Sequence, residues 1–271
     1  MKNNRIAMAV TAVVLIAGGS VGCGKAVSDA ARDAAALGAL AQASAVVSKA
    51  GSADVSMTVT APSTGGKAVA MNGLYSWGAG TGVAMETEMS AADLNMSALV
   101  ADGTITMRLV DGVYYYGVDP LKEGAAKGKS WLKVEASAFV GEDGAAAMKS
   151  GNADPTAGLK LLPHAKDAEE LGTEDVRGVE TVHYTARIPT DKMVGDAGSV
   201  FKGMGATGDV QLDVWVDDKG NPARLKEVVG TTTVEMEFLS FGGSRTVQAP
   251  PAADTADLTE GIKKAKSAGA A

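Results

Sequence analysis

The sequence predicts an α+β fold in which a large curved antiparallel sheet, a half-barrel, carries helices against its concave face. Three observations favour this fold class. Apolar residues have helical spacing in a long Ala-rich stretch near the N-terminus, apolar and polar residues alternate with a period of two from residue 53 onward, and Gly-containing turn signals separate the alternating runs. A strongly twisted sheet of about ten strands tends to curl, so an apolar concave face would enclose a hollow.

The first predicted element is a helix from about Asp29 to Lys49. Alanine, leucine and valine residues recur there at helical spacing, and Ser28 or Asp29 can cap the first turn. Gly51 lies just beyond the last turn, where glycine commonly ends a helix.

Six strands are predicted to follow in an antiparallel meander. Each run alternates apolar residues with Thr, Ser, Glu or Arg, which is the pattern of a strand with one buried face. The dipeptides Asp102-Gly103 and Asp111-Gly112 are strong signals for tight hairpins. The six runs are residues 53–60, 67–77, 83–90, 94–100, 104–109 and 113–118.

The second half of the chain is predicted to alternate between helices and strands. Gly141 and Gly144 interrupt the first of these helices, and Gly203–Gly208 is interpreted as a flexible hinge. The predicted helical stretches are residues 136–150, 159–171, 191–201 and 254–266. The predicted strands are residues 130–134, 179–188, 210–217, 223–229 and 231–240.

Methionine residues mark the apolar face of the predicted meander. All six methionines of this region fall on the apolar face and none falls on the polar face. Flexible, unbranched side chains can pack against a helix or bind an apolar ligand of irregular shape, and both interpretations are open for this face. The candidate ligand-lining residues are Val55, Met57, Met71, Met85, Met96 and Met107, with Met89 on the same face.

The N-terminus has the composition of an export signal. Lys2 and Arg5 precede Ile6–Val21, a run of sixteen uncharged residues that is shorter than the about 20 residues of a membrane-spanning helix. Cys23 is the only cysteine and follows Gly22, as in a bacterial lipoprotein signal, in which the cysteine becomes the first mature residue and carries the lipid. The alternative is an ordinary signal peptide with an incidental thiol.

These features predict four segments: a lipoprotein signal peptide at residues 1–22, a tether at 23–28, a single half-barrel domain at 29–250, and a C-terminal tail with a short helix at 251–271. No linker rich enough to divide two domains interrupts the chain. We expect a monomer at the extracytoplasmic face of the cell membrane. The several acyl chains of a lipidated Cys23 would give a stable anchor, whereas a single chain binds only marginally.

Charge and residue chemistry exclude several function classes. The chain has 25 basic and 32 acidic residues and no basic run, which argues against nucleic acid as a partner. It has only two histidines, no HExxH motif and no cysteine pair, so we expect no metal, no cofactor and no catalysis. His183 is interpreted as a hydrogen-bonded structural residue, and Glu174 and Asp175 are interpreted as part of a salt-bridged turn with Arg177.

Several segments of the chain resemble the LppX/LprG-like lipoproteins of actinobacterial envelopes and, more distantly, LolA and LolB. The segments that carry the resemblance, in order, are Val113–Tyr116, Gly128–Val134, Gly172–Val179, Thr181–Tyr184 and Val214–Pro222. They look like turn and strand signatures of a fold, not catalytic motifs. The resemblance implies a half-barrel of antiparallel strands over helices that holds acylated lipid and carries or presents it outside the cytoplasmic membrane.

Two functional hypotheses follow from the sequence. In the first, a membrane-anchored, non-enzymatic lipoprotein binds and carries or presents a lipid or other apolar molecule in a hydrophobic cavity. In the second, the side chains of the protein fill the hollow themselves, and a binding or signalling module of the envelope acts through a protein partner.

Overall fold

The computed structural model describes residues 26–77, 83–124, 126–149, 157–161, 165–192, 201, 208–242 and 246–269. The predictions for the signal peptide, for Cys23 and for most of the helix at 191–201 concern positions outside the described residues. The same holds for the glycine hinge up to residue 207.

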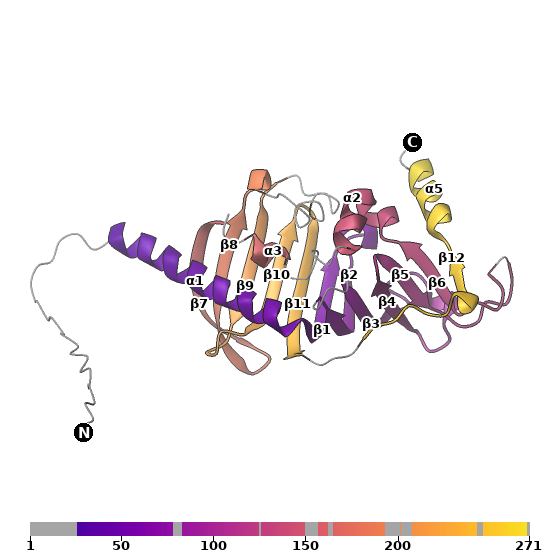
Figure 1. The fold of residues 1–271 in the computed structure, drawn as a ribbon, viewed down its shortest axis with the longest axis horizontal. Coiled ribbons are helices and arrows are strands. Elements are labelled where there is room, and N and C mark those ends of the chain that lie inside the picture. The colour runs from indigo at the N-terminus through magenta and orange to yellow at the C-terminus, as the bar shows by residue number, and fades with distance from the viewer. Residues whose placement is uncertain are drawn as a thin grey trace, which may run out of the picture.

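The alternating runs form one open sheet of twelve strands, in the order β12-β6-β5-β4-β3-β2-β1-β11-β10-β9-β8-β7 (Figure 1). The strands of the first half are β1 Ser52–Thr60, β2 Ala68–Ser76, β3 Ala84–Ser90, β4 Thr104–Val110, β5 Val113–Gly117 and β6 Trp131–Glu135. Those of the second half are β7 Lys166–Val176, β8 Val179–Ile188, β9 Val210–Val216, β10 Pro222–Val229, β11 Thr232–Phe241 and β12 Thr255–Asp257. Neighbouring strands are antiparallel, except that β12 runs parallel to β6. The predicted fold class is confirmed.

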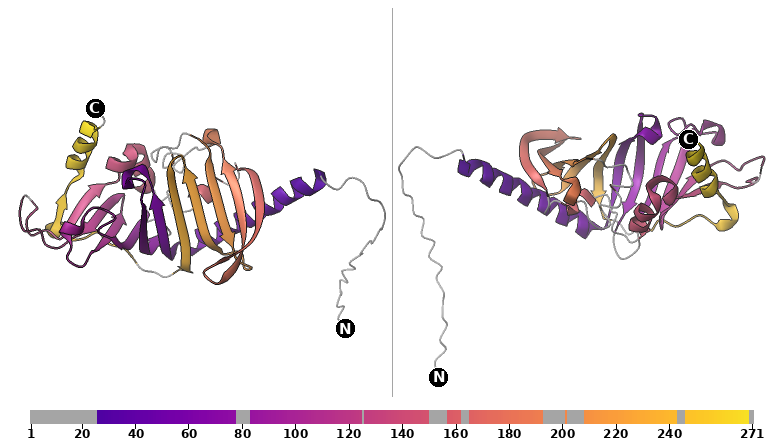
Figure 2. Two further views of the ribbon diagram at one scale, coloured as in Figure 1. Left: turned by 180° about the vertical axis from the view of Figure 1, so that it is seen from behind. Right: turned by 90° about the horizontal axis from the view of Figure 1, so that it is seen from above.

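The helices pack against one face of this sheet, which we call the inner face (Figures 1 and 2). They are α1 Ala26–Ala50, α2 Ser137–Lys149, α3 Ala157–Lys160 and α5 Thr259–Gly269. A stripe on α1 at helical spacing, from Ala36 through Leu40 and Ala43 to Val47, is fully buried and belongs to the same core as the inner-face side chains. The indole Nε1 of Trp77, next to β2, donates to the carbonyl of Val47 over 3.0 Å and ties the end of α1 to the sheet.

The strand predicted at residues 94–100 is wrong. Ser90 in β3 is paired directly with Thr104 in β4, so this segment has no place in the sheet. It forms a turn followed by a 3-10 helix at Ser97–Leu99, and Asn95 adopts a left-handed φ of 56°. Backbone bonds within the segment, such as Met96 N to Ala91 O at 2.8 Å, replace the expected ladder. The apolar residues of this segment, Leu94, Met96 and Leu99, pack against the edge of the core.

The helical stretch predicted at residues 159–171 is also wrong. α3 ends at Lys160, and β7 starts at Lys166 and forms one edge of the sheet. The pairing of β7 with β8 shifts register twice, near Asp167 with its φ of 53° and near Gly172 with its φ of 122°. These bulges interrupt the period-two pattern, so the sequence of this strand does not alternate as the others do.

The C-terminal segment runs from the middle of the sheet to the edge opposite β7. Residues 246–254 lead from β11 to β6, where Ser130 N donates to Asp254 O over 3.0 Å (Figure 1). β12 then pairs with β6, and Lys133 Nζ lies 3.0 Å from the Asp257 carboxylate. The predicted terminal helix exists as α5, but it starts later than predicted because residues 255–257 form a strand.

Gly73 allows an unusually close approach of β2 and β3. It lies opposite Val55 in β1 and Thr87 in β3, in the middle of the first-half strands. A Cβ atom at this position would lie 2.1 Å from the backbone oxygen of Glu86 and 2.8 Å from Thr87 Cα. Both obstacles are backbone atoms, so neither can rotate away. The approach therefore requires glycine.

We predict that Gly73→Ala destabilises the fold by about 3 kcal/mol, because overpacking a rigid site displaces backbone. Gly38→Ala is the matched control, since a Cβ atom at this helical glycine in α1 meets nothing within 4 Å. That control should stabilise the protein by about 0.5–1 kcal/mol. Urea unfolding followed by circular dichroism measures both values, and equal stabilities of Gly73→Ala and the native chain would refute the prediction.

Candidate functional site

The strand register gathers methionine side chains from five strands onto the inner face. One cross-strand row over β11, β1, β2 and β3 consists of Met236, Met57, Met71 and Met89. A neighbouring row over β1 to β4 consists of Val55, Gly73, Thr87 and Met107. A third row over β2 to β5 consists of Tyr75, Met85, Leu109 and Tyr114. We call the surface formed by Val55, Met57, Met71, Met85, Met89, Met107 and Met236 the methionine face; all seven are buried.

Five of the six candidate lining residues lie together on this surface, and one does not. Val55, Met57, Met71, Met85 and Met107 are buried side by side on β1 to β4. The sixth, Met96, is half-buried in the connection between β3 and β4 and packs against the edge of the core. Met96 does not lie on the sheet face because residues 94–100 form a turn and a 3-10 helix, not a strand.

Sequence reasoning missed Met236 as a candidate, although it lies directly opposite Met57. The signal was present, because Val234, Met236 and Phe238 alternate along a predicted strand. What the sequence did not reveal was that β11 pairs with β1, which places the last long strand beside the first.

Aromatic rings close the methionine face at its β5 end. Tyr114 and Tyr116 stack with ring centroids 6.5 Å apart, and Phe139 of α2 meets Tyr114 edge-on at 5.6 Å. Phe139 is 41% exposed, which makes it the solvent-facing rim of this cluster. Burial raises the pKa of Tyr114 to about 12. It also raises the pKa of Tyr116, and the neighbouring Tyr114 adds to that effect.

The opposite, outer face carries a cluster of polar and aromatic side chains on β7 to β10. His183 stacks on Trp215 with centroids 4.1 Å apart, and its two ring nitrogens lie 3.0 Å from Glu174 and 3.2 Å from Asp213. Trp215 donates to the second oxygen of Glu174 over 2.8 Å and receives the Arg224 guanidinium on its ring. The predicted hydrogen bonding of His183 is confirmed.

The salt-bridged turn predicted for Glu174 and Arg177 is wrong. Glu174 bonds to Trp215 and His183, and these hydrogen bonds lower the pKa of its carboxyl. Arg177 pairs instead with Glu237 of β11, at 3.7 Å. Arg177 itself lies in the turn between β7 and β8, with a left-handed φ of 58°.

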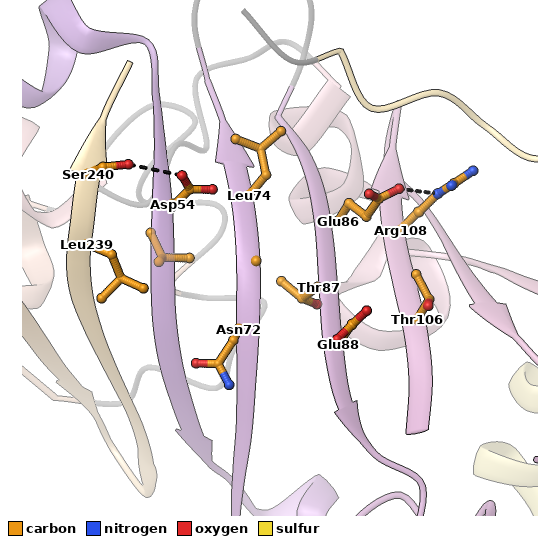
Figure 3. A pocket seen from close by; sticks show the side chains of 12 residues that line it. Asp54, Asn72, Leu74, Glu86, Thr87, Glu88, Thr106, Arg108, Leu239 and Ser240 are labelled. Carbon is orange, nitrogen blue, oxygen red and sulfur yellow. Dashed lines mark hydrogen bonds and ion pairs between the residues drawn. The ribbon is translucent and has the colours of Figure 1, made fainter. Parts of the chain in front are cut away.

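A hollow of about 650 Å³ lies on the outer face around Gly73 (Figure 3). Its polar side chains bond to one another: Ser240 donates to Asp54 over 3.0 Å, and Arg108 to Glu86 over 2.6 Å. Its other labelled lining residues are Asn72, Leu74, Glu88, Thr106 and Leu239, together with Thr87, whose side chain the alternation along β3 assigns to the inner face. This charged, open surface has a different chemistry from the methionine face on the other side of the same strands.

Within the described ranges, no group of three or more His, Cys, Asp or Glu side chains could hold a metal ion. The turn at Asp217 is a hairpin, in which the Asp217 carboxylate accepts the backbone amides of Lys219 and Asn221 at 2.9 and 2.7 Å. Among the helices of the described chain, none has the length and apolar character needed to cross a membrane.

Comparison with known sequences identifies two relatives from Streptomyces, and no protein-family model matches the chain. A Streptomyces coelicolor protein described as "Putative lipoprotein" is 28% identical over 168 residues, 58% of this chain and 53% of the relative. An uncharacterized 31.2 kDa protein of Streptomyces griseus is 25% identical over 181 residues, 60% of this chain and 59% of the relative. The chain thus spans little more than half the length of these relatives.

Two solved structures share the architecture over most of the chain. Lipoprotein LppX of Mycobacterium tuberculosis has a TM-score of 0.53 at 16% identity, with 80% of this chain and 100% of that chain covered. LprF of Mycobacterium bovis has a TM-score of 0.51 at 11% identity, with 80% and 97% covered. The chain has the fold of LppX and LprF. The resemblance indicated by the sequence motifs is therefore confirmed at the level of the fold.

The buried Tyr114 hydroxyl predicts a specific loss of stability at high pH. Because the folded-state pKa of about 12 exceeds the ordinary value of 10, the neutral ring stabilises the fold below pH 10, and this contribution is lost as pH rises toward 12. The Tyr114→Phe side chain cannot ionise. The free energy of unfolding of this variant, measured relative to that of the native chain, should therefore be about 1 kcal/mol higher at pH 11 than at pH 8.

Urea titrations at the two pH values measure this change, with Tyr115→Phe as the control. Tyr115 lies between Tyr114 and Tyr116 in β5 and therefore faces the outer side of the sheet. If the stability difference between Tyr114→Phe and the native chain stays constant from pH 8 to pH 11, the hydroxyl does not titrate as the burial requires.

Proposed function

We propose that the chain is an exported, non-enzymatic lipoprotein that binds a lipid or other apolar molecule against its methionine face and carries or presents it outside the cytoplasmic membrane. The fold shared with LppX and LprF supports this function, as does the sequence similarity to a Streptomyces coelicolor protein described as a lipoprotein. The signal-like N-terminus ending at Cys23 supports the anchor. The observation that carries the proposal is the methionine face itself.

The methionine face suits a ligand that lacks a fixed shape. Thioether side chains are unbranched and polarizable, so they adapt to irregular apolar surfaces better than branched or aromatic ones do. Its seven members are uncharged and come from five adjacent strands. Burial of acyl chains at about 0.8 kcal/mol per CH₂ would provide affinity without polar recognition.

The principal helix contacts flank the methionine face. α1 packs mainly against β7 and also contacts β9 and β10, whereas α2 packs against β6. The strands that contribute most of the methionine face, β1 to β4, lie between these two groups in the sheet. Packing against α1 and α2 therefore explains the apolar character of the two ends of the inner face better than that of its middle.

The proposed anchor would hold the sheet at a distance set by α1. The helix begins at Ala26, so the predicted tether at 23–28 contains only three residues before the helix. The described side chains from Arg32 to Ala35 are exposed, Ala36 is the first buried one, and this end of α1 projects past β7 (Figure 1). At 1.5 Å per residue, the helix from Ala26 to Ala36 would act as a rigid spacer of about 15 Å.

Blocking the methionine face should reduce ligand binding. We predict that Met71→Trp lowers affinity for a fluorescent acyl probe: if the ring excludes about three methylenes of the ligand, the loss is about 2.4 kcal/mol, or roughly 50-fold. Asn72→Trp is the matched control, since it places the same ring on the outer face of the same strand. Probe titration and mass spectrometry of solvent extracts from residues 24–271 measure binding.

Two results of this experiment would count against the proposal. Extracts free of apolar molecules from several expression hosts, together with no uptake of the probe, would mean that the protein fills its own hollow. The second hypothesis, a module that acts through a protein partner, would then replace the carrier. Equal effects of the two tryptophan variants would place any binding away from the methionine face.

Removing the proposed lipidation site should release the protein. Cys23→Ala in the full chain is expected to shift the protein from the membrane fraction to the soluble fraction, while binding of the acyl probe persists. Fractionation with a carbonate wash provides the measurement. A variant that stays in the membrane after the wash would show that Ile6–Val21 anchors the chain and that the lipoprotein assignment is wrong.

A further inference from the structure

Thr87 places one polar group in the middle of the methionine face. It alternates with Met85 and Met89 along β3, where all three are buried, whereas the intervening Glu86 and Glu88 are half-buried and exposed. Thr87 is 1% exposed. Its hydroxyl is thus on the inner side of the sheet, within the apolar surface described above.

The Thr87 hydroxyl has no hydrogen-bond partner in the described chain. The register explains why, because the two residues directly opposite are Gly73 and Met107, and neither offers a carbonyl, hydroxyl or amide on its side chain. Its neighbours along the same face of β3 are methionines. Buried hydroxyl groups in folded proteins nearly always have a partner, because leaving one unsatisfied is costly.

Valine would fill the same volume at this position without that cost, and the rest of the face is apolar. A threonine here therefore serves a purpose that packing does not explain. Its hydroxyl can donate one hydrogen bond to an acceptor that enters the methionine face. In an uncharged, thioether-lined surface, the fitting acceptor is a neutral oxygen attached to apolar chains.

We propose that Thr87 determines the specificity of the methionine face by donating a hydrogen bond to the carbonyl oxygen of an acyl ester in the bound lipid. This inference rests on the proposed function, since it requires the ligand to lie against that face. It adds a chemical criterion to that function: the protein prefers an acyl ester over a hydrocarbon of equal length, because only the ester satisfies the buried hydroxyl.

The test is a competition between two probes that differ in one functional group. The full chain, purified from host membranes and transferred to amphipol, is offered equal amounts of methyl hexadecanoate and of nonadecane, an alkane of similar length, from cyclodextrin. Gas chromatography with mass spectrometry of the protein-bound fraction gives the ester-to-alkane ratio. A ratio is insensitive to the amount of folded protein in each preparation.

Thr87→Val is expected to lower the ester-to-alkane ratio about 5-fold, the value of one hydrogen bond between neutral groups. Thr87→Ser keeps the hydroxyl and should retain most of the native ratio, whereas Thr87→Ala should lose it; this second pair keeps the test valid if the valine variant folds poorly. Thr106→Val is the control, because Thr106 lies on the outer face of β4, next to Met107 in sequence, and should leave the ratio unchanged.

The outcomes separate the two proposals. If the native chain binds both probes and Thr87→Val keeps the native ratio, the methionine face binds apolar molecules but Thr87 does not select them, and the inference fails alone. A water molecule that satisfied the hydroxyl would give this same result. If the native chain binds neither probe, the proposed function fails as well.

Discussion

The pairing of β1 with β11 is the constraint on which the rest of the sheet depends. It joins strands from nearly opposite ends of the described chain, Ser52–Thr60 and Thr232–Phe241. It thereby links the seven strands from β12 to β1 in the sheet order to the five strands from β11 to β7. Met57 lies opposite both Met236 and Met71. Because side chains alternate between faces, a slip of one residue at this seam would turn Met57 to the outer side and divide the methionine face.

The two faces of the sheet have different physical roles. On the outer face, Trp215 is held between His183 and Arg224 and bonds to Glu174, so four consecutive strands are fixed in register by directional contacts. The chain has one cysteine and therefore no internal disulfide, so non-covalent contacts of this kind must hold the strands together. On the inner face, unbranched thioethers adapt to what they contact. Directional contacts are therefore concentrated on the outer face, and unbranched apolar side chains on the inner face.

The sequence predicted most of the fold because most strands have one buried and one solvated face, which produces a period of two. This signal located β1 to β6 and β8 to β11, and with them five of the six candidate lining residues. It failed where that physical cause is absent. Bulges at Asp167 and Gly172 disturb the pattern in β7, β12 is a three-residue parallel edge, and Leu94–Val100 alternates in a turn that packs at the core's edge. Long-range pairing leaves no local pattern, so the place of Met236 and the isolation of the Thr87 hydroxyl required the structure.

A carrier must release its ligand as well as bind it, and the composition of the methionine face bears on both steps. Affinity from buried methylenes is non-directional and can be lost gradually as a chain slides out. A charged pocket would instead hold a headgroup through strong, charge-assisted bonds. One neutral hydroxyl among thioethers lies between these extremes: a hydrogen bond between neutral groups adds only about 1 kcal/mol, enough to favour one class of lipid without fixing it in place. The position of Thr87 in the central row, opposite Gly73 and Met107, is therefore compatible with the proposed carrier function, in which a ligand is selected and later released.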